Sequence, residues 1–182
     1  MSKLGIFMAD GCEEIEGLTV VDLVRRAGIE IEMISVSGEK NVTGSHKIAF
    51  QTDVSKADAD FASYDGIVLP GGMPGTLHLE NSSAVQKVID NANNTNAFIC
   101  AICAAPSILG HKGLLSGKKA VCFPGFENSL EGCESCCEYV VTDGKFITAK
   151  GAGVCIEFGL EIVKQLRNEE LANEIRKSIQ SR

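Results

Sequence analysis

The sequence has few histidines, no cluster of basic residues and no long apolar run. Its 17 lysines and arginines stand against 24 acidic residues, which gives a formal net charge of −7. Nucleic-acid binding needs a basic patch that such a chain does not offer. A membrane-spanning helix needs about 20 consecutive apolar residues, and the apolar stretch at the N-terminus is too short for a signal peptide and is interrupted by Asp10. We therefore expect a soluble, cytoplasmic protein with neither nucleic-acid nor membrane partners.

Motifs for common cofactors are also missing. No G-x-G-x-x-G follows an apolar run and no P-loop lysine motif occurs, so the sequence gives no support for nucleotide binding. We expect neither a cofactor nor a bound metal. Internal repeats, linkers and low-complexity segments are absent too, and 182 residues suit one domain of ordinary size. The sequence predicts a single domain over residues 1–182.

Eight cysteines are many for this length. Without a secretory signal, disulfides are not the default interpretation. Cys100-x2-Cys103 and Cys133-x2-Cys136 have a spacing that can bind zinc, but Cys100 lies inside the apolar run AFICAI, which indicates a buried strand rather than a zinc-binding turn. We therefore do not expect zinc at these four residues. Cys133, Cys136 and Cys137 lie in a polar segment that is either a surface loop or an exposed redox or metal cluster.

Apolar runs that end in turn residues predict buried strands at residues 4–9, 29–37, 64–72 and 97–102. Between the first two runs, apolar residues recur every three positions over 13–27, which predicts a helix. This opening βαβ unit implies a parallel sheet with right-handed crossovers. The remaining expected elements are an outer strand at 46–53, a helix from 82 or 83 to 93, a strand at 118–123, a hairpin at 138–149, and closing helices at 151–167 and 169–178. The pattern predicts a doubly wound α/β domain.

Cys103 stands at the carboxyl end of a predicted strand, where ligands bind in open parallel sheets. The small residues Ala104 and Ala105 follow it directly, so the segment resembles a nucleophile elbow that passes straight from strand into helix. Free N–H groups at a helix start favour a thiolate. The N–H groups of Gly71 and Gly72, at a neighbouring strand end, can add an oxyanion pocket. A buried core cysteine would not need this small-residue turn, so we favour a reactive Cys103.

An acidic partner for Cys103 is expected near the first strand end. Glu13, Glu14 and Glu16 begin the predicted first helix, where acids also stabilise the helix dipole. Spacing alone leaves the choice between Glu16 and Glu13 open. Cys12 lies at the same strand end and is an accessory candidate that resolves an oxidised Cys103.

The motifs DGCEEIE, VRRAGI, VLPGG, AICAAP and GAG-x-x-x-EFGL resemble, in this order and over the whole chain, the ThiJ/PfpI superfamily. The resemblance is closest to its parkinsonism-associated deglycase branch (DJ-one) and to that branch's bacterial chaperone-like relatives. It implies a flavodoxin-like α/β sandwich, with helices on both faces of a mostly parallel sheet, that forms a homodimer. By the resemblance, Cys103 is the reactive cysteine, Glu16 is its acid, Gly71 and Gly72 are the pocket glycines, and Arg26 lies near the dimer interface.

The resemblance implies a cysteine-dependent, cofactor-free glyoxalase or deglycase that acts on small 2-oxoaldehydes or their adducts. The alternative is a redox-sensing or chaperone-like stress protein in which Cys103 is oxidised without turnover. The sequence departs from the family pattern in three places: Ala104 replaces the histidine of protease-like members, Phe123 stands where many deglycase-branch members have a histidine before Pro124, and GAGV replaces GPGT at residues 151–154. We therefore expect no Cys-His-Asp protease mechanism.

Overall fold

Seven strands form one central sheet in the order β10-β11-β7-β6-β1-β2-β5. In this computed structural model, which describes residues 2–181, β10 runs antiparallel to β11 and every other neighbouring pair is parallel. The sheet strands are β1 (Lys3–Met8), β2 (Glu30–Ser35), β5 (Val54–Ser55), β6 (Gly66–Leu69), β7 (Phe98–Ile102), β10 (Val140–Asp143) and β11 (Phe146–Ala149). The predicted doubly wound, mostly parallel α/β fold is confirmed.

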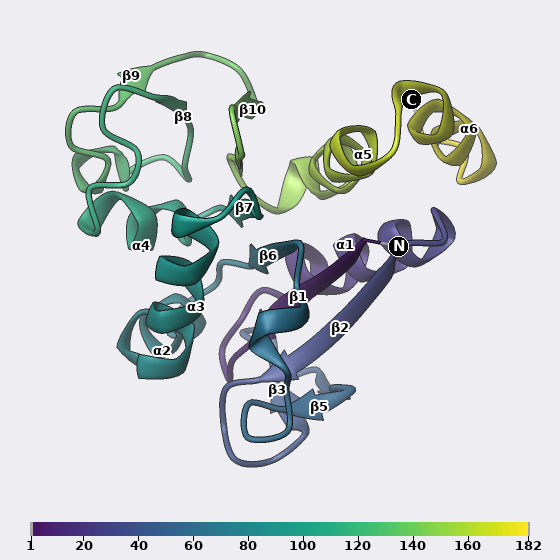
Figure 1. Cartoon of the computed structure of the whole chain (residues 1–182), viewed down its shortest axis with the longest axis vertical. Helices are drawn as coiled ribbons and strands as arrows, with labels where there is room; N and C mark the ends of the chain where they lie inside the picture. The colour runs from purple at the N-terminus through teal and green to yellow at the C-terminus, as the bar shows by residue number, and fades with distance from the viewer. Residues whose placement is uncertain (1, 182) are drawn as a thin grey trace.

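Helices cover both faces of the sheet. The helices are α1 (Glu14–Arg26), α2 (Gly75–Asn81), α3 (Ser83–Asn94), α4 (Pro106–His111), α5 (Cys155–Leu166) and α6 (Glu169–Ser178), with short 3-10 turns at Phe61–Ser63, Glu127–Ser129 and Ala152–Val154. Figure 1 shows α1, α5 and α6 on one side of the strands and α2, α3 and α4 on the other. Within residues 2–181, no helix combines the length and the apolar character that crossing a membrane requires.

Two short sheets lie outside the main one. β3 (Asn41–Thr43) pairs antiparallel with β4 (Ala49–Gln51), and β8 (Lys119–Ala120) pairs parallel with β9 (Glu134–Ser135). The predicted strand at 118–123 is therefore shorter than expected, and its partner is not a strand of the main sheet. The α2 helix, which is only seven residues long, was not expected from the sequence.

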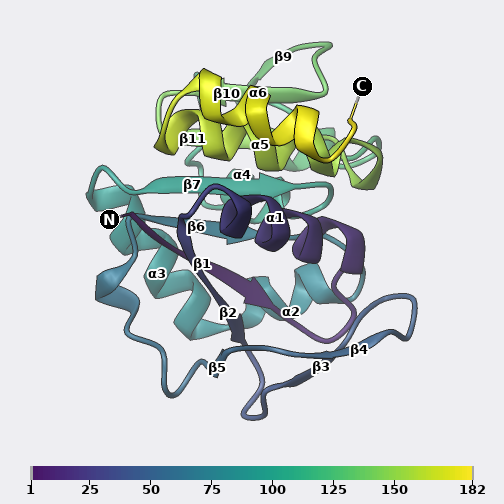
Figure 2. The ribbon, with the colours of Figure 1, turned by 90° about the vertical axis from the view of Figure 1, so that its right-hand side faces the viewer.

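The apolar core is divided by the sheet into two layers. One layer joins α1, α5 and α6 to the sheet, and the other joins α3 and α4 to the opposite face. Figure 2 looks onto the first layer, with α1 and α5 in front of the strands. α1 and α5 pack closely because Gly159 of α5 has no side chain: a Cβ there would lie 2.6 Å from Cδ1 of Leu23. The position of α1, which carries Glu16, is therefore set by contact with α5.

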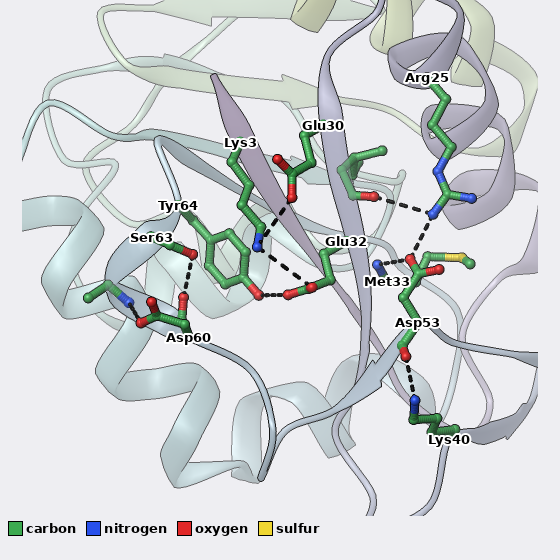
Figure 3. Close-up of polar contacts among 12 residues, drawn as sticks. Lys3, Arg25, Glu30, Glu32, Met33, Lys40, Asp53, Asp60, Ser63 and Tyr64 are labelled. Carbon is green, nitrogen blue, oxygen red and sulfur yellow. Dashed lines mark hydrogen bonds and ion pairs between the residues drawn. The ribbon is translucent and has the colours of Figure 1, made fainter. Parts of the chain in front are cut away.

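The prediction of residues 46–53 as the outer strand of the sheet is wrong. β4 belongs to the separate hairpin, and β5 is the edge strand beside β2. The reason is Asp53, whose Oδ2 accepts hydrogen bonds from the Met33 backbone N–H at 2.8 Å and from Nη2 of Arg25 at 2.7 Å (Figure 3). Asp53 thus bonds to Met33 of β2 through its side chain and through its own N–H, which donates to the Met33 carbonyl at 3.0 Å, and β5 begins at the following residue.

A second polar group joins β1, β2 and the start of β6. Nζ of Lys3 lies 3.4 Å from Oε1 of Glu30 and 3.6 Å from Oε1 of Glu32, and the hydroxyl of Tyr64 donates a hydrogen bond to Glu32 (Figure 3). These contacts lie near the amino ends of the strands, at the opposite end of the sheet from the carboxyl ends. They therefore fix how β1 and β2 align with each other without taking part in the candidate site.

Phe158 of α5 is fully buried in the layer that contains α1. We predict that Phe158→Ala lowers the free energy of unfolding by about 3–5 kcal/mol, because it removes transfer free energy and leaves a cavity. Urea unfolding followed by circular dichroism measures the change. Tyr139→Ala is the matched control, since its ring is 65% exposed, and we expect a change of about 0.5 kcal/mol or less. Equal losses in the two variants would contradict this account of the core.

Candidate active site

Cys103, Glu16 and the pair Gly71-Gly72 come from three different elements and meet at the carboxyl edge of the sheet. Cys103 follows β7, the glycines follow β6 after Pro70, and Glu16 lies in the first turn of α1. β6 and β7 are paired in parallel, so their carboxyl ends lie side by side. The edge predicted from the sequence is therefore where these residues gather.

Cys103 has a backbone conformation that residues other than glycine seldom adopt. Its φ is 66°, in the left-handed region. Two backbone hydrogen bonds hold it there: its N–H donates to the Ala149 carbonyl at 2.9 Å, and its carbonyl accepts from the Phe123 N–H at 2.7 Å. The expected direct passage into a helix is wrong, because α4 begins three residues later at Pro106. A non-glycine residue held in this way is a feature of functional sites.

Glu16 is a fully buried acid beside the thiol. Its Oε2 accepts a hydrogen bond from the Gly71 N–H at 2.8 Å, whereas its Oε1 is buried and has no hydrogen-bond partner among the described residues. Gly71 permits this approach: a Cβ there would lie 2.6 Å from Cβ of Cys103 and 2.7 Å from Oε2 of Glu16. Any side chain at residue 71 would push the thiol and the carboxyl apart.

Burial raises the pKa of Glu16 to about 7, although hydrogen bonds with the Cys103 thiol and the Gly71 N–H lower it in part. Burial, followed by the charge of Glu16 and the hydrogen bond to it, raises the pKa of Cys103 to about 12. The N–H groups of Ala104 and Gly72 act in the opposite direction. The backbone N–H groups therefore favour the thiolate as expected, but their effect on the Cys103 pKa is smaller than that of burial and of Glu16, and the pKa is raised overall. Near neutral pH, the thiol keeps its proton while the carboxyl titrates.

The two glycines have different roles. Because the Gly71 N–H donates to Glu16, it positions the acid and does not face the pocket. The N–H groups of Gly72 and Ala104 lie near the Cys103 sulfur and lower the pKa of its thiol in part, so they are the pair available to a developing oxyanion. Gly72 has a φ of 86°, and a Cβ there would lie 2.3 Å from the Glu13 nitrogen, so glycine is required at this turn.

Phe123 and Gly151, both at places where the sequence departs from the family pattern that it resembles, border the thiol. A Cβ on Gly151 would lie 3.8 Å from Sγ of Cys103 and 3.1 Å from Cδ2 of Phe123, whose side chain is 47% exposed. An aromatic ring thus lines the mouth of the site. The three histidines, at 46, 78 and 111, are all exposed.

The two accessory candidates, Cys12 and Arg26, have different surroundings. Cys12 is fully buried, and burial raises its pKa to about 12, which opposes a role as a nucleophilic thiolate. Arg26 lies on the surface in the last turn of α1, where Nε is 2.7 Å from Oδ2 of Asp22. It follows Glu16 by ten residues, about 15 Å along a helix, so the structure does not bring it into the site.

Glu14 has a structural role that the sequence did not reveal. Its buried carboxylate accepts hydrogen bonds from the backbone N–H groups of His46 at 2.9 Å and Ile48 at 3.3 Å. Although burial alone would raise the pKa of Glu14, these bonds and the His46 ring lower it overall. Among residues 2–181, one group of three potential metal ligands has its atoms within 4.8 Å of one another, namely Glu13, Glu14 and His46. Because both Glu14 oxygens already accept hydrogen bonds, we interpret the group as a clamp between α1 and the β3–β4 hairpin.

A family model described as the DJ-1/PfpI family matches residues 2–165. The chain belongs to the DJ-1/PfpI family. Among its relatives, Drosophila melanogaster protein dj-1beta is 34% identical over 182 residues, covering 98% of this chain and 97% of the relative. Arabidopsis thaliana protein DJ-1 homolog B is 35% identical over 175 residues, covering 95% of this chain but 40% of the plant protein. The chain thus spans less than half of that relative.

Solved structures of DJ-1 proteins share the whole fold. Oxidized Toxoplasma gondii DJ-1 has a TM-score of 0.95 and 31% identity, covering 100% of this chain and 99% of the other. Drosophila melanogaster DJ-1beta has a TM-score of 0.95 and 32% identity, with 100% of each chain covered. A more distant relative, Caenorhabditis elegans glutathione-independent glyoxalase DJR-1.2, is 27% identical over 179 residues, covering 98% of this chain and 95% of the relative. The DJ-1/PfpI family therefore includes glyoxalase-type enzymes.

We predict that Glu16→Gln accelerates alkylation of Cys103 by iodoacetamide at pH 7.5. The amide carries no charge, and its NH2 can donate to the sulfur from the position of the unpartnered Oε1. Each unit of decrease in the thiol pKa then raises the rate about threefold, because the thiolate fraction rises tenfold while the nucleophilicity falls by part of that factor. Mass spectrometry of the alkylated peptide measures the rate at Cys103 itself.

Glu13→Gln is the control for this prediction, because Glu13 contributes to the raised pKa of Glu16 but is not among the causes acting on Cys103. Slower alkylation in Glu16→Gln than in the wild type would mean that Glu16 stabilises the thiolate by donating a proton to it.

Proposed function

We propose that this protein is a cysteine-dependent, cofactor-free glyoxalase that converts small 2-oxoaldehydes to hydroxy acids, with a related deglycase action on their adducts. Cys103 is the nucleophile and Glu16 is the proton carrier. The observation that carries the proposal is the contact between the Cys103 thiol and a buried carboxyl whose pKa is about 7. A general acid–base group works best when its pKa is near the working pH. The glyoxalase name of the C. elegans relative supports the same reaction class.

The first step is addition of sulfur to the aldehyde. Ionised Glu16 takes the thiol proton as the Cys103 sulfur bonds to the aldehyde carbon, and the carbonyl electron pair moves to oxygen. The N–H groups of Gly72 and Ala104, which lower the pKa of the Cys103 thiol in part, stabilise the resulting alkoxide. Glu16 then returns the proton to that oxygen, and the product is a hemithioacetal.

The second step is an internal oxidation and reduction that needs no external oxidant. Glu16 removes the proton from the former aldehyde carbon and, through an enediol, a proton is delivered to the neighbouring carbonyl carbon. The former aldehyde carbon becomes a thioester and the former ketone becomes an alcohol. Water then cleaves the thioester, which releases the 2-hydroxy acid and restores the thiol. The aromatic ring of Phe123 at the mouth replaces the histidine of other branch members, so Glu16 carries all of the proton transfer.

We predict that Cys103→Ser abolishes methylglyoxal turnover, because a serine hydroxyl remains un-ionised beside this carboxyl. We expect Glu16→Gln to lower turnover by about 10²–10⁴, the range lost with a general acid–base group. Formation of lactate from methylglyoxal measures both effects. Cys137→Ser is the matched control, because Cys137 is an exposed thiol, and its turnover should equal that of the wild type.

Turnover by Glu16→Gln at the wild-type rate would contradict the proton-carrier role. If the wild type is no faster than an equal concentration of free thiol, the glyoxalase proposal is wrong. The second candidate function, a redox sensor, would then apply, and an oxidized Toxoplasma gondii DJ-1 is its precedent in the family. Peroxide treatment would in that case convert Cys103 to a sulfinic acid, which mass spectrometry detects.

We further propose that the protein acts as a homodimer. Ile15 of α1 and Ile48 of the β3–β4 hairpin are each 55% exposed, and the Glu14 clamp holds these two elements together. Burying such side chains between subunits is favourable. Arg26 is exposed on the same helix, in line with a position near that interface.

We predict that Ile48→Glu converts the dimer to a monomer, since the interface would then bury a charge. Light scattering at micromolar concentration should give twice the 19.3 kDa chain mass for the wild type and 19.3 kDa for the variant. Leu77→Glu on α2, where the side chain is 44% exposed, is the control and should remain dimeric. A wild-type mass of 19.3 kDa would contradict the proposal directly.

A further inference from the structure

Phe123 is held in a fixed position beside the Cys103 thiol. Its N–H donates to the Cys103 carbonyl at 2.7 Å, and its carbonyl accepts from the Phe126 N–H at 3.1 Å. Pro124 and Gly125, whose φ is 101°, are the two central residues of this turn, which is the pattern of a type II turn. Because both of its main-chain polar groups are bonded, Phe123 presents its ring at the mouth of the site from a rigid backbone.

Gly151 leaves a gap between this ring and the sulfur. A Cβ there would lie 3.1 Å from Cδ2 and 3.6 Å from Cε2 of Phe123, and 3.8 Å from Sγ of Cys103. The edge of the ring and the sulfur therefore border the same point. The φ of Gly151 is 160°, an extended conformation that any residue adopts, so what glycine contributes here is space rather than a backbone angle. A group bonded to the sulfur has room to extend toward the ring.

The surroundings of this gap favour an uncharged, apolar group. Glu16 supplies the charge that raises the pKa of the Cys103 thiol. Lys150, which is adjacent in sequence to the gap, donates from Nζ to the Cys137 carbonyl at 3.0 Å and lies 4.8 Å from the centroid of the Tyr139 ring. Its ammonium is thus held by the segment that joins β9 to β10. An anionic group in the gap would be repelled by the carboxylate, whereas an apolar one meets an aromatic side chain that is 47% exposed.

We propose that Phe123 selects 2-oxoaldehydes with a flat aromatic substituent, such as phenylglyoxal, over those with a small one, such as methylglyoxal. This selection rests on the proposed function, in which the Cys103 sulfur bonds to the aldehyde carbon. The neighbouring ketone carbon carries the substituent, which extends through the gap at Gly151 and contacts the ring of Phe123. Aromatic pairs with centroids about 4.5–7 Å apart are stabilised beyond the effect of the area that they bury.

A pair of alkylating ketones tests this selection without turnover. Phenacyl bromide and bromoacetone are the bromomethyl analogues of phenylglyoxal and methylglyoxal. In both, the Cys103 sulfur displaces bromide from the carbon that corresponds to the aldehyde carbon. Mass spectrometry of the Cys103 peptide gives the two rates, and dividing each by the rate for glutathione removes the intrinsic difference in reactivity. We expect the corrected ratio of phenacyl bromide to bromoacetone to exceed one in the wild type.

Two variants change the ring and the gap separately. Phe123→Leu should lower the corrected ratio by about 2- to 12-fold, because leucine keeps an apolar side chain but removes the aromatic pair. Gly151→Ala should lower the ratio as well, since its methyl group fills the gap while the ring of Phe123 remains. Phe61→Leu is the matched control, because the Phe61 ring packs against the core layer on the opposite face of the sheet from the layer that Cys103 contacts. Its ratio should equal that of the wild type.

The alkylation ratios can overturn the proposal in three ways. The first is a corrected ratio of one in the wild type. The second is a ratio in Phe123→Leu that equals the wild-type ratio. The third is an equal fall in Phe123→Leu and Phe61→Leu, since the ratio would then not depend on the ring beside the thiol.

Turnover separates the selection by Phe123 from the glyoxalase activity itself. In an active enzyme, kcat/KM for phenylglyoxal relative to methylglyoxal should fall in Phe123→Leu by the same factor as the alkylation ratio. If the wild type turns over neither aldehyde, the glyoxalase proposal is wrong, and the alkylation ratios still decide whether Phe123 selects aromatic ligands. If the wild type turns over both and Phe123→Leu leaves their ratio unchanged, the selection by Phe123 alone is wrong.

Discussion

The hydrogen bond from the Gly71 N–H to the buried carboxyl of Glu16 is the contact on which the reactive site depends. It joins α1 to the turn after β6 across 55 residues of sequence. It uses one carboxyl oxygen, and the other has no hydrogen-bond partner within residues 2–181. A buried acid with an unpaired oxygen favours the protonated state, since ionisation in a low-dielectric site is costly. The same carboxyl raises the pKa of Cys103, so one buried proton links the acid to the thiol.

Contacts outside the pocket keep α1 where Glu16 can reach Gly71. Gly159 lets α5 pack against Leu23, and the Glu14 carboxylate holds the β3–β4 hairpin over the start of the helix. Both contacts depend on glycine. A Cβ at Gly159 would lie 2.6 Å from Cδ1 of Leu23, and a Cβ at Gly44 of the hairpin would lie 2.2 Å from Cδ of Glu14. The adjacent acids of α1 therefore divide their roles: Glu14 is ionised and structural, whereas Glu16 is buried and titrates near neutrality.

The backbone around Cys103 is held by segments that are distant in sequence. Phe123 donates its N–H to the Cys103 carbonyl, and the Cys103 N–H donates to the Ala149 carbonyl. Cys103 also has a carboxyl and two backbone N–H groups beside its sulfur, which suit covalent catalysis.

The sequence by itself determined the parallel α/β fold, because the apolar runs of β1, β6 and β7 and the three-residue spacing in α1 are local patterns. It also pointed to Cys103 as the residue for which we propose reactivity, since small residues after a strand end predict a reactive turn. The family motifs, rather than spacing, distinguished Glu16 from Glu13. Only the tertiary structure decided that β5, rather than residues 46–53, is the edge strand and that the Gly71 N–H serves Glu16. These outcomes depend on contacts between segments distant in sequence, and local periodicity carries no information about which distant segments pack together.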